Sequence, residues 1–560
     1  MKRLLVLVTF GVLKLSAQQM ELRSNVTIQR SADEATGTAS IEGTVINDVT
    51  NAPVKKAQVH LSGPLRHMVS PAVTDATGHF AFTHLDAGSW FVQASHSNFD
   101  MNRGLILGDN HKQVTVTADQ HVSGVELRLT PMGSISGSLI DEFGDPAAGC
   151  QVGAVSMANG ANRRPRQQWA ANSDDRGEYQ IADVPAGRYF VFERCPGALA
   201  APHGFLPRGD PRTPSLAFVP EFYGGTPGLT GATSVLVHPG AEARGIDFRV
   251  KTVAASSMEI RLASTQPYDP KSVQVTIRPV DAPMWGFPAF LDFKTGMFRS
   301  QPVAPGSYTI TADVFNNPRL HGETTVNIGK GAPATAEVEL AAPMSVAGTL
   351  HMDTEEQAER GGPLQVMLQP LADWYGSELP QTTVNKDGSF TLPNVVVGRW
   401  RLQVMNTQAS VRSATFGDRE ISPGGFDIVP GAAGPLYVVL TSKRMQTAVR
   451  VTGVENGTQA QVVAWPKDAE AGDPYQQFSA MVEGGSSVAN LSVPPGSYRV
   501  YALESTQPWA IAQDPALWAA IADRGKLVEA KDDAGAAEVN VTVDLITRDE
   551  VKRALDRALQ

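Results

Sequence analysis

The stretch Thr74–Trp90, TDATGHFAFTHLDAGSW, contains the pattern that decides the fold of this chain. A polar turn ends at Gly78 and is followed by Phe80 and Phe82, which alternate with other residues. The triplet Gly88-Ser89-Trp90 then opens the next apolar run. Glycine supplies the positive φ that closes a hairpin, and a period of two places one face of a strand on a core. The stretch therefore predicts two strands joined by a bend.

The same pattern recurs along the chain. A Gly-x-aromatic triplet occurs five times, at intervals of 99, 119, 92 and 98 residues. In the first four copies a second glycine lies ten residues earlier, with an aromatic residue two positions after it. Repeats of about 100 residues, rich in short strands and turns, are typical of tandem β-sandwiches. The triplets are Gly88-Ser89-Trp90, Gly187-Arg188-Tyr189, Gly306-Ser307-Tyr308, Gly398-Arg399-Trp400 and Gly496-Ser497-Tyr498.

We therefore expect an all-β chain, a string of five transthyretin-like or Ig-like β-sandwiches with a short C-terminal helix. Thr547 and Glu550 form a capping box that begins this helix, and it should pack on the last sandwich or fray. A second short helix is expected from Asp514 to Gly525. The expected boundaries are 1–17 for a signal peptide, 18–38 for a linker, 39–130, 131–251, 252–342, 343–442 and 443–546 for the sandwiches, and 547–560 for the helix.

The first two copies resemble the carboxypeptidase regulatory-like family, which is similar to the B-type repeats of collagen-binding adhesins. The resemblance rests on the strand Ile41–Val45, on Ala57–Leu61 and on the turn and triplet elements of Thr74–Trp90. It implies a non-catalytic sandwich with a transthyretin-like fold, often an accessory to secreted enzymes, receptors or surface proteins. It also raises the possibility of Lys–Asn isopeptide cross-links. It does not imply peptidase activity.

Composition and the first residues indicate the compartment. Met1-Lys2-Arg3, the apolar run Leu4–Leu13 and Ser16-Ala17 follow the three-part pattern of a secretory signal peptide. We expect an exported chain, periplasmic, extracellular or envelope-associated, without a transmembrane span in its mature form. The net charge of −10 argues against nucleic-acid binding.

The two cysteines, Cys150 and Cys195, both lie in the second copy, and export favours a disulfide between them over two thiols. We expect no metal site and no cofactor. Asp75, Asp174, Asp175 and Asp387 precede or adjoin turn glycines, where an aspartate more often bonds the turn backbone than calcium. Seven of the eleven histidines lie in the first copy, and we interpret them as scattered surface residues rather than metal ligands: His60, His67, His79, His84, His96, His111 and His121.

Aromatic residues outside the repeat frame are the candidate binding residues. Trp169, Trp285 and Trp374 lie between the early strands and the turn glycine of their copies, with Phe287 and Tyr375 nearby. Sugars stack on exposed flat rings, and loops carry binding sites on sandwiches. A tryptophan in a sandwich is, however, more often part of the core. Two further candidates follow a proline-rich loop in the second copy, Phe222 and Tyr223.

The sequence contains no His-Glu-x-x-His, Gly-x-Ser-x-Gly or phosphate-loop motif. We therefore expect no enzyme. The leading hypothesis is a multidomain binding protein for carbohydrates or surfaces, with polysaccharide or an envelope or surface protein as partner. The alternatives are a structural or assembly scaffold of the cell envelope and, third, a secreted hydrolase.

Overall fold

In the computed structural model the chain is built almost entirely of β-strands, as expected. The structure describes residues 37–558 except 64–68, 158–164, 196–214, 316–318, 330–333, 354–361, 372–378, 423, 430–433, 456–459, 468–476, 483–485, 505–519 and 531–540. The expected signal peptide and nearly all of the linker lie outside the described residues. Strands follow one another along the chain in packed groups, each around its own hydrophobic cluster.

The first group is a two-layered sandwich, with sheet orders β4-β1-β7 and β3-β2-β5-β6. Strand β1 pairs antiparallel with β4 and parallel with β7. A short helix, α1, is inserted between β5 and β6, where the sequence pattern predicts none. The elements are β1 (Ala39–Asn47), β2 (Gln58–Ser62), β3 (Ala72–Val73), β4 (His79–Leu85), β5 (Gly88–Ser95), α1 (Met101–Leu107), β6 (His111–Val116) and β7 (His121–Leu129).

The second group repeats this plan with additions. One sheet has the order β11-β8-β16 with β17 also on β8, and the other has β10-β9-β12-β14 with β15 also on β12. Strand β13 pairs with β18, just beyond the boundary expected at residue 251. The elements are β8 (Gly133–Ile140), β9 (Gln151–Met157), β10 (Pro165–Asn172), β11 (Glu178–Val184), β12 (Gly187–Arg194), β13 (Ser215–Phe218), β14 (Glu221–Phe222), β15 (Ser234–Val237), β16 (Glu242–Ala243), β17 (Phe248–Arg249) and β18 (Thr252–Ala255).

The third group is one continuous path of strands in the order β24-β23-β20-β21-β22-β19-β25. A bridge between His321 and Ala341 joins the two ends of the path, so the sheet curls around its core. The elements are β19 (Met258–Ser264), η2 (Pro270–Ser272), β20 (Val273–Pro279), β21 (Phe287–Asp292), β22 (Met297–Ser300), β23 (Gly306–Val314), β24 (Leu320–Ile328) and β25 (Ala334–Leu340).

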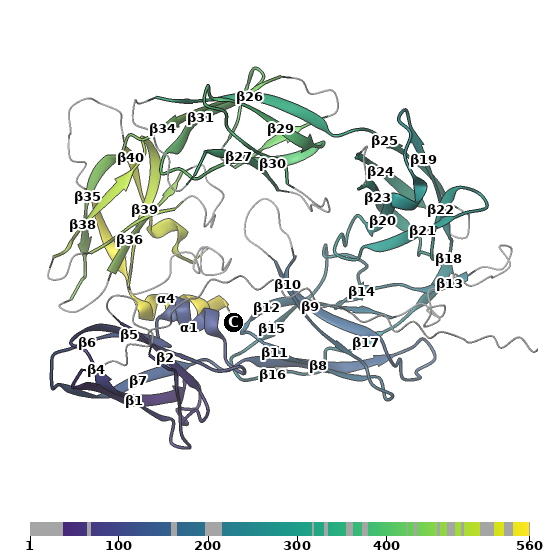
Figure 1. Ribbon diagram of the computed structural model, residues 1–560. Coiled ribbons are helices and arrows are strands. Elements are labelled where there is room, and N and C mark those ends of the chain that lie inside the picture. Colours follow the sequence, from purple (N-terminus) through teal and green to yellow (C-terminus); the bar gives the residue numbers. More distant parts are fainter. Residues whose placement is uncertain are drawn as a thin grey trace, which may run out of the picture.

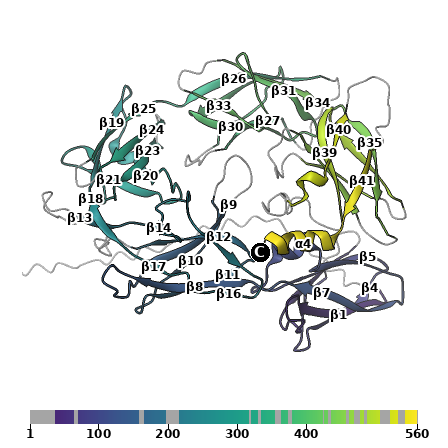
Figure 2. The same ribbon diagram turned by 180° about the vertical axis from the view of Figure 1, so that it is seen from behind.

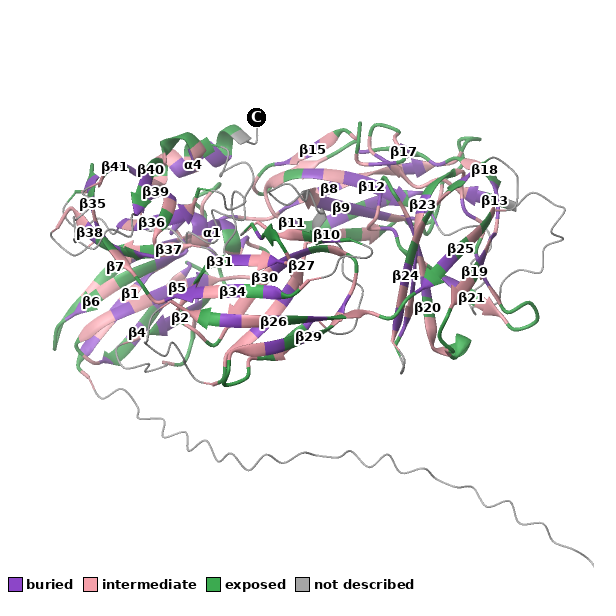
Figure 3. Ribbon diagram, turned by 90° about the horizontal axis from the view of Figure 1, so that it is seen from above, coloured by how far each residue is buried: buried purple, intermediate pink, exposed green. Residues whose placement is uncertain are grey.

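The fourth group has the sheets β29-β26-β34-β31-β32 and β28-β27-β30-β33. In Figure 3 buried and exposed residues alternate along β26, as the period of two requires. The elements are β26 (Met344–Met352), β27 (Gln365–Pro370), β28 (Gln381–Thr383), β29 (Ser389–Val395), β30 (Gly398–Met405), β31 (Ser410–Phe416), β32 (Arg419–Glu420), β33 (Phe426–Ile428) and β34 (Leu436–Thr441).

The last group follows the order β37-β36-β39-β41-β35-β38, with β40 also on β39, and ends in α4. The helix expected from Asp514 lies mostly outside the described residues. Its described end is the short turn η4, which stops before Gly525. The elements are β35 (Met445–Thr452), β36 (Ala460–Pro466), β37 (Phe478–Met481), β38 (Val488–Val493), β39 (Gly496–Glu504), η4 (Ala522–Arg524), β40 (Lys526–Ala530), β41 (Val541–Ile546) and α4 (Arg548–Ala558).

The repeat has a direct structural cause. In each triplet the aromatic side chain is buried and donates a hydrogen bond to the backbone carbonyl oxygen four residues earlier, which ties the bend to the strand that follows. Trp90 Nε1 donates to Asp86 over 3.0 Å, and Tyr308 Oη donates to Ala304 over 2.8 Å. Burial of a large ring is therefore combined with satisfaction of its polar atom. The other three bonds run from Tyr189 to Pro185, from Trp400 to Val396 and from Tyr498 to Pro494.

Two glycines of the first sandwich illustrate why the pattern needs this residue. Gly78 has a φ of +75°, which L side chains rarely adopt. Gly43 lies where β1 meets β7, and a Cβ there would lie 1.9 Å from the carbonyl oxygen of Val125. Only a residue without a side chain allows this parallel strand to approach.

The groups of strands are arranged as a closed ring and not as an open string (Figures 1 and 2). The chain runs around the ring once, and α4 at its end lies against α1 in the first sandwich. The expected tandem array is thus closed on itself, and α4 packs on the first sandwich as well as on the last group of strands.

Candidate functional site

The contact between the two ends of the ring brings together chemically distinctive side chains. We call it the closure contact and define it by α1, α4, Asp48, Asp109 and Arg128. Both helices are well capped. Asp100 accepts hydrogen bonds from the backbone N–H groups of Asn102 and Arg103 at the start of α1, and Gly108 ends the helix in the left-handed conformation, with φ +69°.

The predicted capping box at the start of α4 is present. Glu550 accepts the backbone N–H of Thr547 at 2.9 Å, and the backbone N–H of Glu550 donates to the hydroxyl of Thr547 at 3.3 Å. The backbone N–H of Arg548 donates to Glu504 at the end of β39, over 2.8 Å. These bonds satisfy amide groups that a helix start leaves free, so α4 is fixed to the last group of strands.

The centre of the closure contact is apolar and shared by both ends of the chain. Ile106 and Leu107 of α1 belong to the same buried cluster as Trp465 of β36 and Leu555 of α4. Burial of large apolar side chains is the main source of association energy at such contacts. The full cluster consists of Ile106, Leu107, Val463, Trp465, Tyr501, Leu503, Ile521, Ile546, Val551, Ala554 and Leu555.

Three ion pairs surround this centre, each between the first sandwich and α4. Arg103 pairs with Asp556 at 2.9 Å, Arg548 with Asp109 at 3.4 Å, and Lys552 with Asp48 at 3.2 Å. Residues 548, 552 and 556 are four positions apart, so they follow one another along one face of the helix. Asp48 also lies 3.8 Å from Arg128 of its own sandwich.

The charges at this contact alter the titration of the groups beside them. Burial raises the pKa of the Asp109 carboxyl; Arg548 opposes this rise and Asp48 adds to it. Burial also lowers the pKa of His111, and the positive charge of Arg548 lowers it further. His111 is 8% exposed and lies 2.9 Å from Asn110 Oδ1. The interpretation of this histidine as a surface residue is therefore wrong, because its side chain is buried, with its ring 5.1 Å from that of Phe91.

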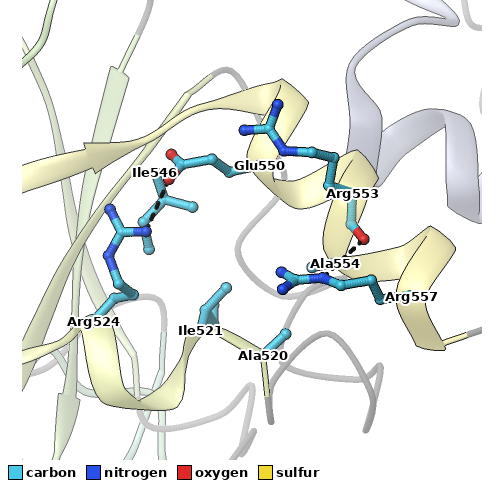
Figure 4. Close-up of a pocket in the computed structure, with 8 residues that line it drawn as sticks. All are labelled: Ala520, Ile521, Arg524, Ile546, Glu550, Arg553, Ala554 and Arg557. Atoms are coloured by element: carbon cyan, nitrogen blue, oxygen red, sulfur yellow. Dashed lines mark hydrogen bonds and ion pairs between the residues drawn. The ribbon is translucent and has the colours of Figure 1, made fainter.

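A second face of α4 lines a small pocket with a volume of about 140 Å³ (Figure 4). Its apolar part includes Ile521 and Ile546, and its polar part is basic. Arg524 Nη1 pairs with Glu550 Oε1 at 2.9 Å. The lining residues are Ala520, Ile521, Arg524, Ile546, Glu550, Arg553, Ala554 and Arg557.

Two of the predicted binding residues are buried in the structure. Phe222 is 0% exposed and Trp285 is 5% exposed. Their rings stack at 5.0 Å, and both contact Phe192. This cluster joins the second and third groups of strands. The prediction that Phe222 and Trp285 present ring faces to a sugar is therefore wrong, since the junction covers both rings.

The other predicted aromatic residues are not brought together into one site. Trp169 in β10 is half-buried and packs edge-on against Tyr189 at 5.4 Å. Tyr223 packs on the second core, and Phe287 packs on the third core. Trp374 and Tyr375 lie outside the described residues.

The two cysteines form a disulfide in the structure. In the ladder between β9 and β12, Gln151 lies opposite Arg194, which places Cys150 and Cys195 opposite each other at the next position. Beside this bridge, the Glu193 side chain is 1% exposed, and its Oε2 atom lies 3.5 Å from the sulfur of Cys195. Burial raises the pKa of Glu193 to about 8.

Three of the four turn aspartates accept hydrogen bonds from the turn backbone, as expected. Asp75 Oδ1 accepts from the N–H groups of Thr77 and His79, and Asp174 and Asp387 make equivalent bonds. The hydrogen bonds from the Thr77 hydroxyl and from the backbone of His79 and Thr77 lower the pKa of Asp75. Within the described residues, no group of three or more His, Cys, Asp and Glu side chains is arranged to hold a metal ion, and no lysine is buried in a core where an isopeptide bond could form.

The helices of the described part offer no candidate for a membrane crossing, since none combines the required length with an apolar sequence. The closure contact itself was not found from the sequence. Its one visible signal was the capping box at Thr547, which predicted the helix but not its partner. The residues of α1 carry no periodic pattern long enough to predict a helix.

Comparison with known proteins places part of the chain in a family. No curated protein matches it. Among solved structures it is similar to the TIE protein of Bacillus anthracis, at 13% identity and a TM-score of 0.18, over 54% of this chain and 51% of that one. It is also similar to the minor pilin GBS52 of Streptococcus agalactiae, at 11% identity and a TM-score of 0.21, over 39% and 97%. A third is BcpA, the major pilin subunit of Bacillus cereus, at 8% identity and a TM-score of 0.16, over 72% and 99%.

The chain thus spans about half the length of the TIE protein. Likenesses with such TM-scores carry no information about function. The family model of the carboxypeptidase regulatory-like domain matches residues 40–130. This match covers the first sandwich, with the strands β1 to β7 and the inserted helix α1. The resemblance inferred from the sequence is confirmed there: residues 40–130 form a carboxypeptidase regulatory-like domain.

Proposed function

We propose that this chain is an exported, non-catalytic scaffold of the cell envelope or its surroundings, made of five β-sandwich domains closed into a ring. The observation that carries the proposal is the closure contact between α1 and α4. An open string of domains can bend at each linker, whereas a ring closed by a buried contact holds its domains in fixed relative positions. A protein that positions partners needs this property.

The chemistry of the α4 pocket supports a role without catalysis. Its one carboxylate, Glu550, has both oxygens engaged, one by Arg524 and the other by Thr547. Burial raises the pKa of Glu550, but the hydrogen bonds from Thr547 and the pairing with Arg524 outweigh it and lower the pKa. A general acid or base needs a free carboxyl with a pKa near the working pH, and Glu550 has neither.

The partners of such a scaffold are, in this proposal, envelope or surface proteins. Fixed sandwich loops around a ring offer several separate binding surfaces at constant spacing. Polysaccharide stays a candidate ligand of the half-buried rings of Trp169, Tyr223 and Phe287. Trp374 and Tyr375, which lie outside the described residues, stay candidates from the sequence alone.

The proposal is tested with the purified full chain and with Leu555→Asp, which places a charge in the closure contact. Chemical cross-linking in the envelope fraction of the producing cells, followed by mass spectrometry, should identify the same partner proteins reproducibly with wild type and lose at least some of them with Leu555→Asp. Turnover of a peptide or glycoside substrate by wild type would overturn the non-catalytic role. A glycan array with wild type and Trp374→Ala tests the polysaccharide candidate separately.

A further inference from the structure

The α4 pocket has an unbalanced charge that the fold does not explain. Three arginines line it and a single carboxylate, Glu550, opposes them. That carboxylate is used by Arg524 and by the helix cap. Within the described residues, neither Arg553 nor Arg557 forms an ion pair with a carboxylate. Two positive charges are thus unbalanced in a chain whose net charge is −10.

These side chains line the pocket from one helix, with the Arg553 guanidinium at the rim beside Glu550 and Arg557 further along (Figure 4). Residues 550, 553, 554 and 557 lie three and four positions apart, so they share one face of α4. The Nε atom of Arg557 donates to the backbone carbonyl oxygen of Arg553 at 3.3 Å, which orients the guanidinium and leaves its terminal nitrogens free. In Figure 4 Arg557 extends across the pocket towards Ala520 and Ile521, and Arg524 lies on the opposite side.

The floor of the pocket is apolar. Ile521, Ile546 and Ala554 are 3%, 1% and 4% exposed and belong to the apolar cluster at the centre of the closure contact. The planar guanidinium of an arginine can donate two parallel hydrogen bonds to a carboxylate. The apolar floor can contact a hydrocarbon group of the same ligand. The volume of about 140 Å³ is far below the several hundred Å³ of pockets for drug-sized ligands. The pocket therefore suits a small anion with a short apolar tail.

We propose that the α4 pocket binds a small organic carboxylate, with Arg557 as the bidentate partner and Arg553 as the second charge. The hydrocarbon part lies on Ile521 and Ile546. Such a ligand bridges α4 and the segment 520–524 of the last sandwich, so it stabilises the helix that closes the ring. Arg524 keeps its pairing with Glu550 and adds to the positive potential.

The test uses the full chain and sodium butyrate, followed by saturation-transfer difference NMR at constant ionic strength. Wild type should give a saturable signal, and Arg557→Gln should weaken the affinity at least about tenfold, as expected for the loss of a charge-assisted pair. Arg557→Lys keeps the positive charge but cannot form two parallel hydrogen bonds. Its affinity for butyrate should therefore lie between those of wild type and Arg557→Gln. The matched control Arg419→Gln removes an exposed arginine from β32, remote from the pocket, and should bind like wild type.

Three outcomes would overturn the proposal. The first is the absence of saturable binding to wild type. The second is equal affinity of wild type and Arg557→Gln, which would show that the arginines are only solvated helix residues. The third is displacement of butyrate by inorganic phosphate at much lower concentration than by other carboxylates, which would assign the pocket to phosphate groups. A rise in the unfolding temperature of wild type with butyrate, absent in Arg557→Gln, supports the proposal independently.

Discussion

Arg103 in α1 and Asp556 in α4 are 453 residues apart in the sequence, and their side chains form an ion pair with a distance of 2.9 Å between Nη2 and Oδ1. The Arg103 side chain is 7% exposed and that of Asp556 is 52% exposed. The pair therefore lies at the edge of the closure contact, where the Arg103 guanidinium is buried and the Asp556 carboxylate is exposed to water. This pair is one of three that join the first sandwich to the end of the chain.

Asp556→Asn should weaken the closure contact by about 1–2 kcal/mol. A buried charge that loses its partner is costly, and water near position 556 reduces this cost. Hydrogen exchange of the α4 amides should become faster, while the cores of the sandwiches keep their protection. Asp549→Asn, an exposed acidic residue in the first turn of the same helix, is the control. Equal exchange in the two variants would contradict the assigned role of the pair.

Leu555→Asp should open the ring. Leu555 is 5% exposed in the shared apolar cluster, and an unpaired carboxylate there cannot be accommodated without detaching α4. Small-angle X-ray scattering should show a larger radius of gyration and a greater maximum dimension than in wild type. Circular dichroism should retain the β-sheet signal, because the sandwiches have separate cores. Unchanged scattering would mean that the ring does not depend on this contact.

Trp285→Ala should loosen the junction between the second and third groups of strands. Removal of a buried tryptophan side chain lowers the free energy of unfolding by about 3–5 kcal/mol where the surrounding residues cannot fill the cavity. Phe192 and Phe222 would also lose their ring contacts with Trp285. Scanning calorimetry should show a transition that shifts to lower temperature. Phe293→Ala, at a ring that is 76% exposed, should leave the transitions unchanged. A loss of glycan binding with an unaltered calorimetric profile would contradict the structural role.

Reduction of the disulfide should destabilise the second sandwich. The bridge closes a loop with a sequence separation of 45, and the chain-entropy model assigns such a loop about 4 kcal/mol. Urea unfolding with and without a reductant should differ for wild type. The double variant Cys150→Ala/Cys195→Ala should unfold like reduced wild type and ignore the reductant. Alkylation of both cysteines in native, unreduced protein would show that no bridge exists.

Glu193 should make the second sandwich less stable at alkaline pH. Burial raises the pKa of its carboxyl to about 8, from an ordinary value of 4.5. Between these values the folded state holds a proton that the unfolded state has lost, so the free energy of unfolding falls as the pH rises through this window. The total decrease in the free energy of unfolding across this window is on the order of a few kcal/mol.

Glu193→Gln removes this titration. The stability of this variant relative to wild type should therefore increase from pH 5 to pH 9, as measured by denaturant titrations at each pH. Glu178→Gln, an exposed residue in β11 of the same sandwich, is the control and should show no such trend. A parallel pH dependence of wild type and Glu193→Gln would contradict the burial of an ionisable group at this position.

The repeat made the all-β fold predictable because its chemistry is local. The hydrogen bond from Trp90 to Asp86 spans four residues, and the turn bond from Thr77 to Asp75 spans two. In each copy, a few adjacent residues therefore determine the bend. The capping box of Thr547 and Glu550 is equally local, and the helix that it predicts is present.

The site was less predictable because it depends on which surfaces meet. Nothing near Trp285 in the sequence shows that Phe192 and Phe222 of the preceding sandwich cover it. The same holds for His111, whose burial its neighbours in the sequence do not show. An aromatic ring outside the repeat frame is equally consistent with a ligand platform and with a junction between domains.

By itself, the sequence determined the strands, their turns, the family of the first domain and the C-terminal helix, since these follow from contacts among residues close in the chain. Only the tertiary structure decided that the ends meet, that Phe222 and Trp285 join two groups of strands, and that three arginines surround one pocket. Arg103 and Asp556 at the two ends are 453 residues apart, and their encounter depends on the angle of every intervening junction. Phe222 and Trp285, and the arginines of the pocket, are closer in the chain but come from separate elements whose packing no local pattern specifies. Local patterning carries no information about those angles.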